Sequence, residues 1–273
     1  MEQKLRSLQL TQLEMLKKVD RICREHDIPY SLYAGTLLGA VRHQGFIPWD
    51  DDLDICMSRE NYDKFIALWP ETEHEGYLMQ NKENASAFSQ SFTKIRKEHT
   101  TFLQSEGENE LYHTGIFIDI FPIDRIPDGK LARYLFWWDC MRYQLYTREF
   151  VPQQYGRVKK WVSAVILALV SPKRRKAERE RLLKRITRNN NNRELETAAI
   201  ETLGSMRKPF AKEMLDEYTE IRFEDGMFMC FAGWDNHLRR KFGDYMQLPP
   251  EEERTWKHLP LVLDFEHNYE ELI

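Results

Sequence analysis

The sequence predicts an α/β fold, in which an α/β core over about residues 26–125 is followed by a mostly helical half. Three observations lead to this prediction. Apolar residues recur at helical spacing ahead of the core, over residues 4–25. Short segments rich in β-branched and aromatic residues follow, and the longest is Gly115–Asp124. After Pro127–Gly129 the apolar spacing becomes helical over most of residues 130–220.

The first half alternates between the two kinds of element. The helix over residues 4–25 is expected to stop before Pro29. A short strand is predicted in "YSLYAG", a turn into a short helix in "GTLLGAVR", and a strand in "DLDICM". Ser58 is expected to cap a helix that runs to about Trp69. Further strands are predicted at residues 77–80, 87–96 and 100–104. The strand predicted within the segment Gly115–Asp124 is expected to end at Pro122.

The second half is predicted to be helical with interruptions. The helical pattern is broken by "VPQQYG", by the dipeptide "SP" at residues 171–172, and by the polar run Asn189–Asn192. The tail returns to mixed structure. "GWDNHLRRKFG" predicts a helix closed by Gly243, and "LPPEEER" predicts a turn into the final segment.

The composition is that of a folded protein with a packed core. Hydrophobic residues make up 42% of the 273 residues. The formal net charge is −4, which argues against a nucleic-acid-binding protein that relies on bulk positive charge. The cysteines are widely spaced and form no C-x-x-C pair, so we expect no disulfide framework or zinc knuckle, and a reducing cytosol. They are Cys23, Cys56, Cys140 and Cys230.

A run of acids just before the "DLDICM" strand is the strongest chemical feature. It contains Asp50, Asp51, Asp52 and Asp54. A solvated loop is the ordinary explanation for such a run. A bound cation is favoured instead because Asp52 and Asp54 alternate with apolar residues on a half-buried strand, where uncompensated carboxylates are costly. The upstream glycines of "GTLLGAVR" also allow the backbone to approach a ligand closely.

Other common sites do not fit the sequence. An EF-hand loop starting at Asp50 would place Ile55 where glycine is needed and Asn61 where glutamate is needed. The P-loop, G-x-G-x-x-G, H-E-x-x-H and G-x-S-x-G patterns are absent. A hard-cation site remains, for Mg²⁺ or alternatively Mn²⁺, with Asp52 and Asp54 as ligands. Asp119, which lies alone in an apolar strand, is the candidate third carboxylate, unless backbone amides satisfy it in the core.

Several segments together resemble the LicD family, which is related to the fukutin-type transferases within the nucleotidyltransferase-fold superfamily. They are "IPYSLYAGTLLGAVRHQGFIPWDDDLDICMSRENYDKF", "KIR" with "TTF", "GIFIDIFPID", and "FGDYMQLPPEEER" followed by a histidine. The similarity extends with gaps from about residue 10 to 260. It implies a nucleotidyltransferase-like core with a mixed sheet and an N-terminal helix in residues 1–128. Residues 129–273 would form a helical region that packs on the core, with a C-terminal segment returning to it.

The resemblance also implies an activity. In that superfamily a glycine turn holds phosphate, which by position corresponds to Gly35 and Thr36. An Asp-x-Asp pair binds Mg²⁺, which corresponds to Asp52 and Asp54, and Asp119 completes the catalytic site. The implied reaction moves a phospho-substituted alcohol, typically phosphocholine, from a CDP-activated donor. The acceptor is a sugar hydroxyl of a bacterial cell-surface glycan or of its lipid-linked precursor.

Neighbouring side chains could assist this reaction. Arg42 and Lys94 are expected to face the phosphates, and Arg96 shares a strand face with Lys94. His43 and His113 lie near the motifs, although a structural role is the commoner one for a lone histidine. A quaternary ammonium group would favour an aromatic cage, for which no residue is assigned. The available rings are Trp49, Phe46, Tyr33, Phe121 and Trp234.

Two alternative functions stay open. The donor could instead be CDP-ribitol, CDP-glycerol or CDP-ethanolamine, or a nucleoside triphosphate in true nucleotidyl transfer. A non-catalytic metal or nucleotide sensor would be expected to have lost one acid, and Asp52, Asp54 and Asp119 are all present.

The expected location is cytoplasmic, with one candidate membrane contact. The sequence has no run of about 18 apolar residues, so no spanning helix is predicted. Residues 157–188 combine an apolar centre, Trp161–Val170, with flanking basic residues. This pattern favours peripheral contact with anionic lipid on the inner face of the cell membrane. A buried helix followed by a solvated basic helix is the alternative.

Overall fold

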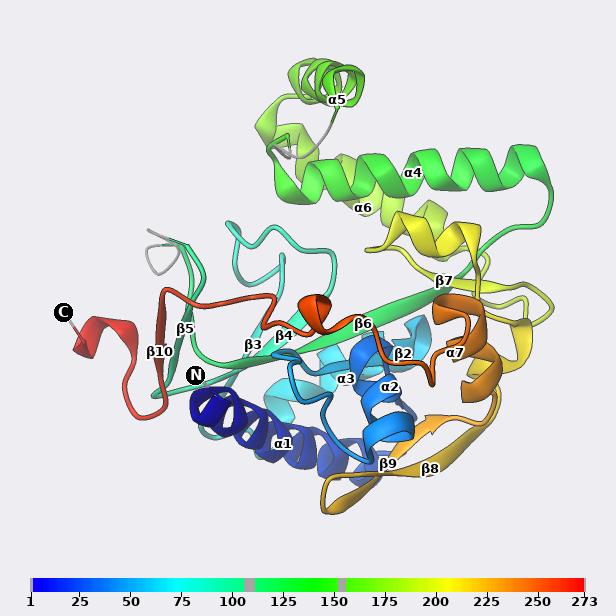
Figure 1. Ribbon diagram of the computed structural model, residues 1–273. Coiled ribbons are helices and arrows are strands. Elements are labelled where there is room, and N and C mark those ends of the chain that lie inside the picture. The colour runs from blue at the N-terminus through cyan, green and yellow to red at the C-terminus, as the bar shows by residue number, and fades with distance from the viewer. Residues whose placement is uncertain (1, 106–110, 152–155, 273) are drawn as a thin grey trace. The chain divides into compact units, whose positions relative to one another are not determined.

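The computed structural model describes residues 2–105, 111–151 and 156–272 (Figure 1). By its internal contacts the chain divides into two units. The first unit contains Met1–Gln80, Thr93–Pro122 and Glu213–Ile273, so both ends of the chain belong to it. The second unit contains Asn81–Phe92 and Ile123–Lys212.

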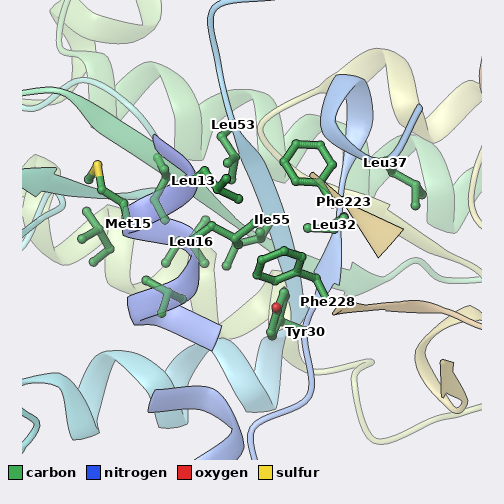
Figure 2. Close-up of a cluster of buried hydrophobic side chains, with 14 of the residues drawn as sticks. Leu13, Met15, Leu16, Tyr30, Leu32, Leu37, Leu53, Ile55, Phe223 and Phe228 are labelled. Atoms are coloured by element: carbon green, nitrogen blue, oxygen red, sulfur yellow. The ribbon is translucent and has the colours of Figure 1, made fainter. Parts of the chain in front are cut away.

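The N-terminal helix forms because its apolar residues recur on one side. Helix α1 spans Glu2–Glu25, which confirms the helix predicted over residues 4–25. Leu8, Leu16 and Val19 on this side are fully buried. Figure 2 shows Leu13 and Leu16 of α1 in the core with Ile55, Tyr30 and the two rings of a later hairpin, Phe223 and Phe228.

The main sheet has the strand order β1-β2-β6-β4-β3, and β7 also pairs with β6. With helices around it, this sheet confirms the predicted α/β fold. The predicted strands at 77–80 and 100–104 correspond to β3 and β5, whereas the strand predicted over 87–96 begins only at Thr93. The strands of the main sheet are β1 Ser31–Leu32, β2 Asp54–Ser58, β3 Tyr77–Gln80, β4 Thr93–Lys97, β6 Phe117–Arg125 and β7 Thr197–Ala199. Strand β5, Thr101–Leu103, belongs to a separate two-stranded sheet.

Strand β6 is longer than predicted. The expectation that it ends at Pro122 is wrong, because the strand continues to Arg125. Residues 117–120 pair with β4, and residues 123–125 pair with β7. Pro122 falls between these two pairings, so neither needs the backbone N–H that proline lacks.

The remaining elements of the first unit surround the sheet. Helix α2 spans Ala34–His43, and helix α3 spans Arg59–Leu68. The Ser58 side chain accepts a hydrogen bond from the Asn61 N–H, as predicted for a helix cap. Strands β8 (Tyr218–Phe223) and β9 (Gly226–Phe231) form a hairpin, and β10 (Val262–Asp264) pairs with β5. Helix α7, Trp234–Phe242, ends at Gly243, whose φ of 71° is readily adopted by glycine.

The second unit is mainly helical. It contains α4 (Lys130–Arg148), α5 (Arg157–Leu169) and α6 (Pro172–Thr187), and Figure 1 shows α6 running along α4. The expectation of helix as far as residue 220 is wrong beyond Thr187, where 3₁₀ turns and strands β7 and β8 follow. Asn190 explains the change, since its side chain bonds the Asp124 side chain and the Arg125 N–H and so ties the asparagine run to β6.

Two further predictions concern the whole chain. All four cysteines are buried as free thiols. Within the described ranges, no helix has both the length and the hydropathy needed to cross a membrane. The break predicted in "VPQQYG" lies mostly in residues 152–155, outside the described residues.

Candidate active site

Two buried glutamines of α1 hold the acidic loop in place. The Gln9 Nε2 donates hydrogen bonds to the carbonyls of Ile47 (3.2 Å) and Asp50 (2.9 Å). The Gln12 Nε2 donates to the carbonyls of Asp51 (3.0 Å) and Phe117 (3.3 Å), so it joins the loop to β6. Both glutamine side chains are buried, which makes these bonds well shielded from water. The backbone that carries the acids is therefore fixed against α1 and β6.

The start of α2 is packed against the same loop. A Cβ on Gly35 would lie 2.5 Å from Oδ2 of Asp50, so only glycine leaves room for that carboxylate. The Thr36 hydroxyl accepts a hydrogen bond of 2.8 Å from the Asp54 N–H, which connects the helix start to β2. Free N–H groups at a helix N-terminus attract anions, and so the Gly35–Thr36 turn can serve a phosphate near these acids.

The three acids singled out by the sequence come together because β2 and β6 are neighbours. The Asp119 N–H donates to the carbonyl of Leu53, the residue between Asp52 and Asp54. Burial is the largest cause that raises the pKa of each of the three carboxyls. Mutual repulsion adds to it, since Asp119 raises the pKa of Asp52, and Asp52 and Asp119 raise that of Asp54.

Lys94 faces this cluster from the next strand. It lies opposite Asp119 in the β4–β6 register, and its Nζ is 2.6 Å from Asp119 Oδ1. The Nζ also lies 3.3 Å from the centre of the Phe117 ring. Burial lowers the pKa of Lys94, while the Asp119 carboxylate opposes that effect. Arg96 donates to Gln80 Oε1 and to the Gly115 carbonyl, and its charge also acts to lower the pKa of Asp119.

The two acids at the start of the loop have their own partners. Burial, followed by repulsion from Asp52 and Asp51, raises the pKa of Asp50 to about 7. Asp51 accepts from the His258 N–H (2.6 Å), and its other oxygen is 3.0 Å from the His258 ring Nδ1. The ligand atoms of Asp51, Asp52 and His258 all lie within 4.8 Å of one another. Asp54 and Asp119 lie outside that group, and Asp52 is common to it and to the predicted trio.

Lys241 on α7 is a charged neighbour that the sequence reasoning missed. Burial lowers the pKa of Lys241, and the carboxylates of Asp54 and Asp52 act in the opposite direction. Its Nζ lies 4.5 Å from the centre of the Tyr33 ring, just before α2. His258 was missed as well. The one available signal was the histidine that follows "LPPEEER" in the segments with a family resemblance.

Arg42 does not face the acid trio directly. Its guanidinium donates to the carbonyls of Tyr245 (3.0 Å) and Gln247 (3.3 Å) and lines a pocket of about 410 Å³. Trp49 and Lys257 line the same pocket, and Lys257 lowers the pKa of Asp50 against the effect of burial. The pocket is thus next to the acidic loop, and its lining includes two cations, two acids and the rings of Trp49, Phe242 and Tyr245.

The other candidates are dispersed. His43 accepts from the Arg42 Nε, and His113 is bonded to Asn268 and to the Gly115 N–H. Neither contact involves the acid trio. The suggested aromatic rings do not form one cage: Tyr33 stands near Phe121, with 5.5 Å between ring centres, whereas Phe46 packs on Phe223 in the core.

The carboxylates suit a hard divalent cation. They offer oxygen ligands and lie in a largely buried site. Burial raises the pKa of each of them, and repulsion from neighbouring carboxylates adds to that effect at Asp52 and Asp54. A divalent cation would offset that repulsion and would prefer oxygen ligands over nitrogen or sulfur. Combined with a helix N-terminus, the buried Lys94 and the half-buried Lys241, the arrangement can bind a phosphate-containing molecule through a metal ion.

Comparison with known proteins agrees with this description. Residues 27–153 match the family model described as LicD/FKTN/FKRP, nucleotidyltransferase domain. The chain is 30% identical over 261 residues to the lipopolysaccharide cholinephosphotransferase LicD of Haemophilus influenzae, which covers 93% of this chain and 96% of that protein. It is also 31% and 27% identical to uncharacterized proteins of Rickettsia prowazekii and Rickettsia typhi, covering 49% and 41% of their lengths.

Proposed function

This chain belongs to the LicD family, and on that basis we propose that it is a transferase that moves phosphocholine from CDP-choline to a sugar hydroxyl of a lipopolysaccharide or related cell-surface glycan. The observation that carries the proposal is the acid cluster formed by Asp52, Asp54 and Asp119 on and next to β2 and β6, within the matched domain. The similarity to the lipopolysaccharide cholinephosphotransferase of Haemophilus influenzae supports the phosphocholine group and the lipopolysaccharide acceptor.

We assign Mg²⁺ to Asp52, Asp54 and Asp119. When bound, the ion would neutralise charge on the diphosphate of the donor and on the departing CMP. Two observations support the assignment: all three side chains offer oxygen, and Asp54 and Asp119 are buried with exposed fractions of only 9% and 8%. Mn²⁺ has similar ligand preferences and is an alternative.

The protein's own groups place the donor. The Gly35–Thr36 turn at the N-terminus of α2 would hold a phosphate through its backbone N–H groups. Lys241 interacts electrostatically with Asp52 and Asp54, and Lys94 pairs with Asp119, so both would add positive charge near the reacting phosphate. Such fixed positive charge is the main source of catalysis expected in phosphoryl-type transfer.

The transfer itself would break one bond and form one. The sugar oxygen attacks the phosphorus that carries choline, and the bond from that phosphorus to the bridging oxygen breaks, so CMP leaves. We assign the proton of the sugar hydroxyl to Asp119. Burial raises the pKa of this carboxyl, which makes it a better proton acceptor, and Lys94 holds its Oδ1 in place.

Product analysis tests the proposal. The protein is incubated with CDP-choline, Mg²⁺ and a lipopolysaccharide acceptor, and CMP and choline-modified glycan are measured by chromatography and mass spectrometry. We expect acceptor-dependent CMP and a phosphocholine mass increment on the glycan. The same assay is run with CDP-ethanolamine, CDP-glycerol, CDP-ribitol and nucleoside triphosphates. Turnover with one of these and none with CDP-choline would overturn the donor assignment, and metal binding without any turnover would indicate a sensor.

A further inference from the structure

Helix α5 exposes a stripe of large apolar side chains. Val158, Trp161, Val165 and Leu169 have exposed fractions of 76%, 69%, 36% and 79%. They are spaced by three, four and four residues, so they lie on one face of the helix. We call these four residues the α5 stripe.

The opposite face of α5 is the one that packs against its own unit. Ser163 and Leu167 are buried, and at about 100° per residue they lie roughly opposite the α5 stripe. The helix therefore carries apolar side chains on two sides, and within the described part of its unit only the side with Ser163 and Leu167 is buried. A helix that is apolar all round is normally buried in a core or a membrane. The α5 stripe thus needs a partner outside the described contacts.

The charges around the α5 stripe have one sign. The stretch Gly156–Ala177 contains seven lysines and arginines and no aspartate or glutamate, whereas the chain as a whole carries −4. Arg175 is used inside the unit, since it donates to the carbonyls of Leu167 and Val170 at the end of α5. The other six are exposed: Arg157, Lys159, Lys160, Lys173, Arg174 and Lys176.

We infer that the α5 stripe docks on an anionic lipid surface, with α5 lying in the plane of the interface. Apolar side chains would enter the acyl boundary, and the flanking lysines and arginines would reach the headgroups with their long stems along the apolar layer. Clustered positive charge in a stretch that contains no acid of its own is the complement of an anionic surface.

A second copy of the chain is the less favourable occupant. A two-fold interface brings the same surface of both copies together. The α5 stripe of one copy would then meet that of the other, and the basic side chains around both would face each other. Like charges across an interface oppose binding, so the charge pattern favours lipid.

This inference concerns a surface of the second unit and does not depend on the proposed transfer activity. It is tested by sedimenting the full-length protein with vesicles of phosphatidylglycerol and phosphatidylcholine, or of phosphatidylcholine alone, at low and high salt. We expect binding to the anionic vesicles at low salt, little binding to neutral vesicles, and release at high salt because ions screen the headgroups. A protein that stays in the supernatant at low salt contradicts the inference.

Matched variants distinguish vesicle binding through the α5 stripe from vesicle binding by general electrostatic attraction. Trp161→Glu and Leu169→Glu place an acid in the stripe, and Ala164→Glu places the same charge on an exposed site of the same helix outside it. We expect the stripe variants to weaken vesicle binding at least about tenfold and the control to weaken it much less, because only the former put a charge into the acyl boundary. Equal losses in all three variants contradict the stripe.

Two further measurements complete the test. Trp161→Ser, which adds no charge, should also weaken binding, and circular dichroism should show unchanged helix content, since this side chain is exposed. Sedimentation equilibrium without lipid then addresses the second copy. A dimer that Trp161→Glu converts to a monomer would overturn the lipid assignment in favour of self-association.

Discussion

Lys94 Nζ and Asp119 Oδ1 form a 2.6 Å ion pair between directly opposed residues of the antiparallel strands β4 and β6. Both residues are buried, at 8% exposed. A buried pair of this kind contributes little net stability compared with apolar residues, but removing one partner leaves an uncompensated charge. The pair therefore couples the stability of the sheet to the charge state of the acidic site.

Lys94→Met should destabilise the metal-free protein by about 3–5 kcal/mol, because it leaves Asp119 buried without its cation. Asp119→Asn alone should also destabilise, since Lys94 then loses its partner. The double variant should recover part of the loss, as expected for two residues in direct contact. Urea unfolding measures all three. Lys17→Met is the control, because Lys17 pairs with Asp225 at the surface, where an ion pair contributes at most about 1 kcal/mol. Strictly additive effects in the double variant would contradict the coupling.

Asp52→Asn and Asp54→Asn should each reduce transfer by about 10²–10³, the usual effect of removing one charge-stabilising group from a catalytic site. They should also reduce the increase in melting temperature that Mg²⁺ causes in the wild type. Steady-state CMP release and thermal melts with and without Mg²⁺ measure these effects. Asp225→Asn, at an exposed acid of the β8–β9 turn, is the control. Near wild-type turnover of either variant at saturating Mg²⁺ would refute the ligand assignment.

Gly35→Ala should lower kcat/KM by up to about 10², since a displacement of roughly 1 Å in a reacting group can have that effect. The new Cβ would lie 2.5 Å from Asp50 Oδ2, so either the carboxylate or the start of α2 must move. Gly204→Ala is the matched control, because a Cβ there meets nothing within 4 Å. Equal activity of the two variants would show that the turn tolerates a Cβ at residue 35 without loss of function.

Lys241→Met should reduce kcat more than it raises KM, because the missing charge would act mainly on the reacting phosphate. A loss of about 10² is expected, at the low end of the usual range of about 10²–10³ for a lost electrostatic contact. Its neighbour on α7, Arg240, is exposed, so Arg240→Met serves as the control for the helix. An unchanged kcat in Lys241→Met would remove this residue from the proposed mechanism.

The ionisation of Glu224 should make the stability of the folded protein depend on pH in the acidic range. Its carboxylate is bonded by the Arg6 guanidinium and by the Phe46 N–H, and the Arg6 bond is the largest cause that lowers its pKa. A lowered pKa in the folded state means that the contribution is present above the ordinary value near 4.5 and is lost as pH falls through the folded pKa. Glu224→Gln should therefore lower the unfolding midpoint at pH 7, and the difference should shrink below pH 4.5. A constant difference from pH 3 to pH 7 would contradict this.

The part of the site that is local in sequence was predictable. Asp52 and Asp54 alternate with Leu53 and Ile55, and this alternation predicted a strand over "DLDICM". The strand β2 begins only at Asp54, so Asp52 lies in the loop just before it. Asp119 was recognisable because a lone acid in an apolar strand requires a partner. That partner, Lys94, also came from a predicted strand, although its direct opposition to Asp119 depends on strand register, which the sequence pattern does not specify.

The part built by distant segments was not predictable from patterns. Lys241 and His258 reach the acids from the C-terminal segment, and periodicity contains no information about which later segment returns to a site. For Arg42 the phosphate contact stays a prediction. Its position after the glycine turn suggested a phosphate contact, whereas the C-terminal carbonyls of Tyr245 and Gln247 take up its guanidinium.

The two glutamines of α1 affect where the boundaries of a truncated recombinant protein should be placed. The family match begins at residue 27, after α1 has ended, and stops at residue 153, before α7. A fragment trimmed to those boundaries would lack the amide donors that Gln9 and Gln12 supply to the acidic loop. The recognisable domain is thus smaller than the smallest piece that can keep its own acids in position, and a useful truncation has to retain the first helix.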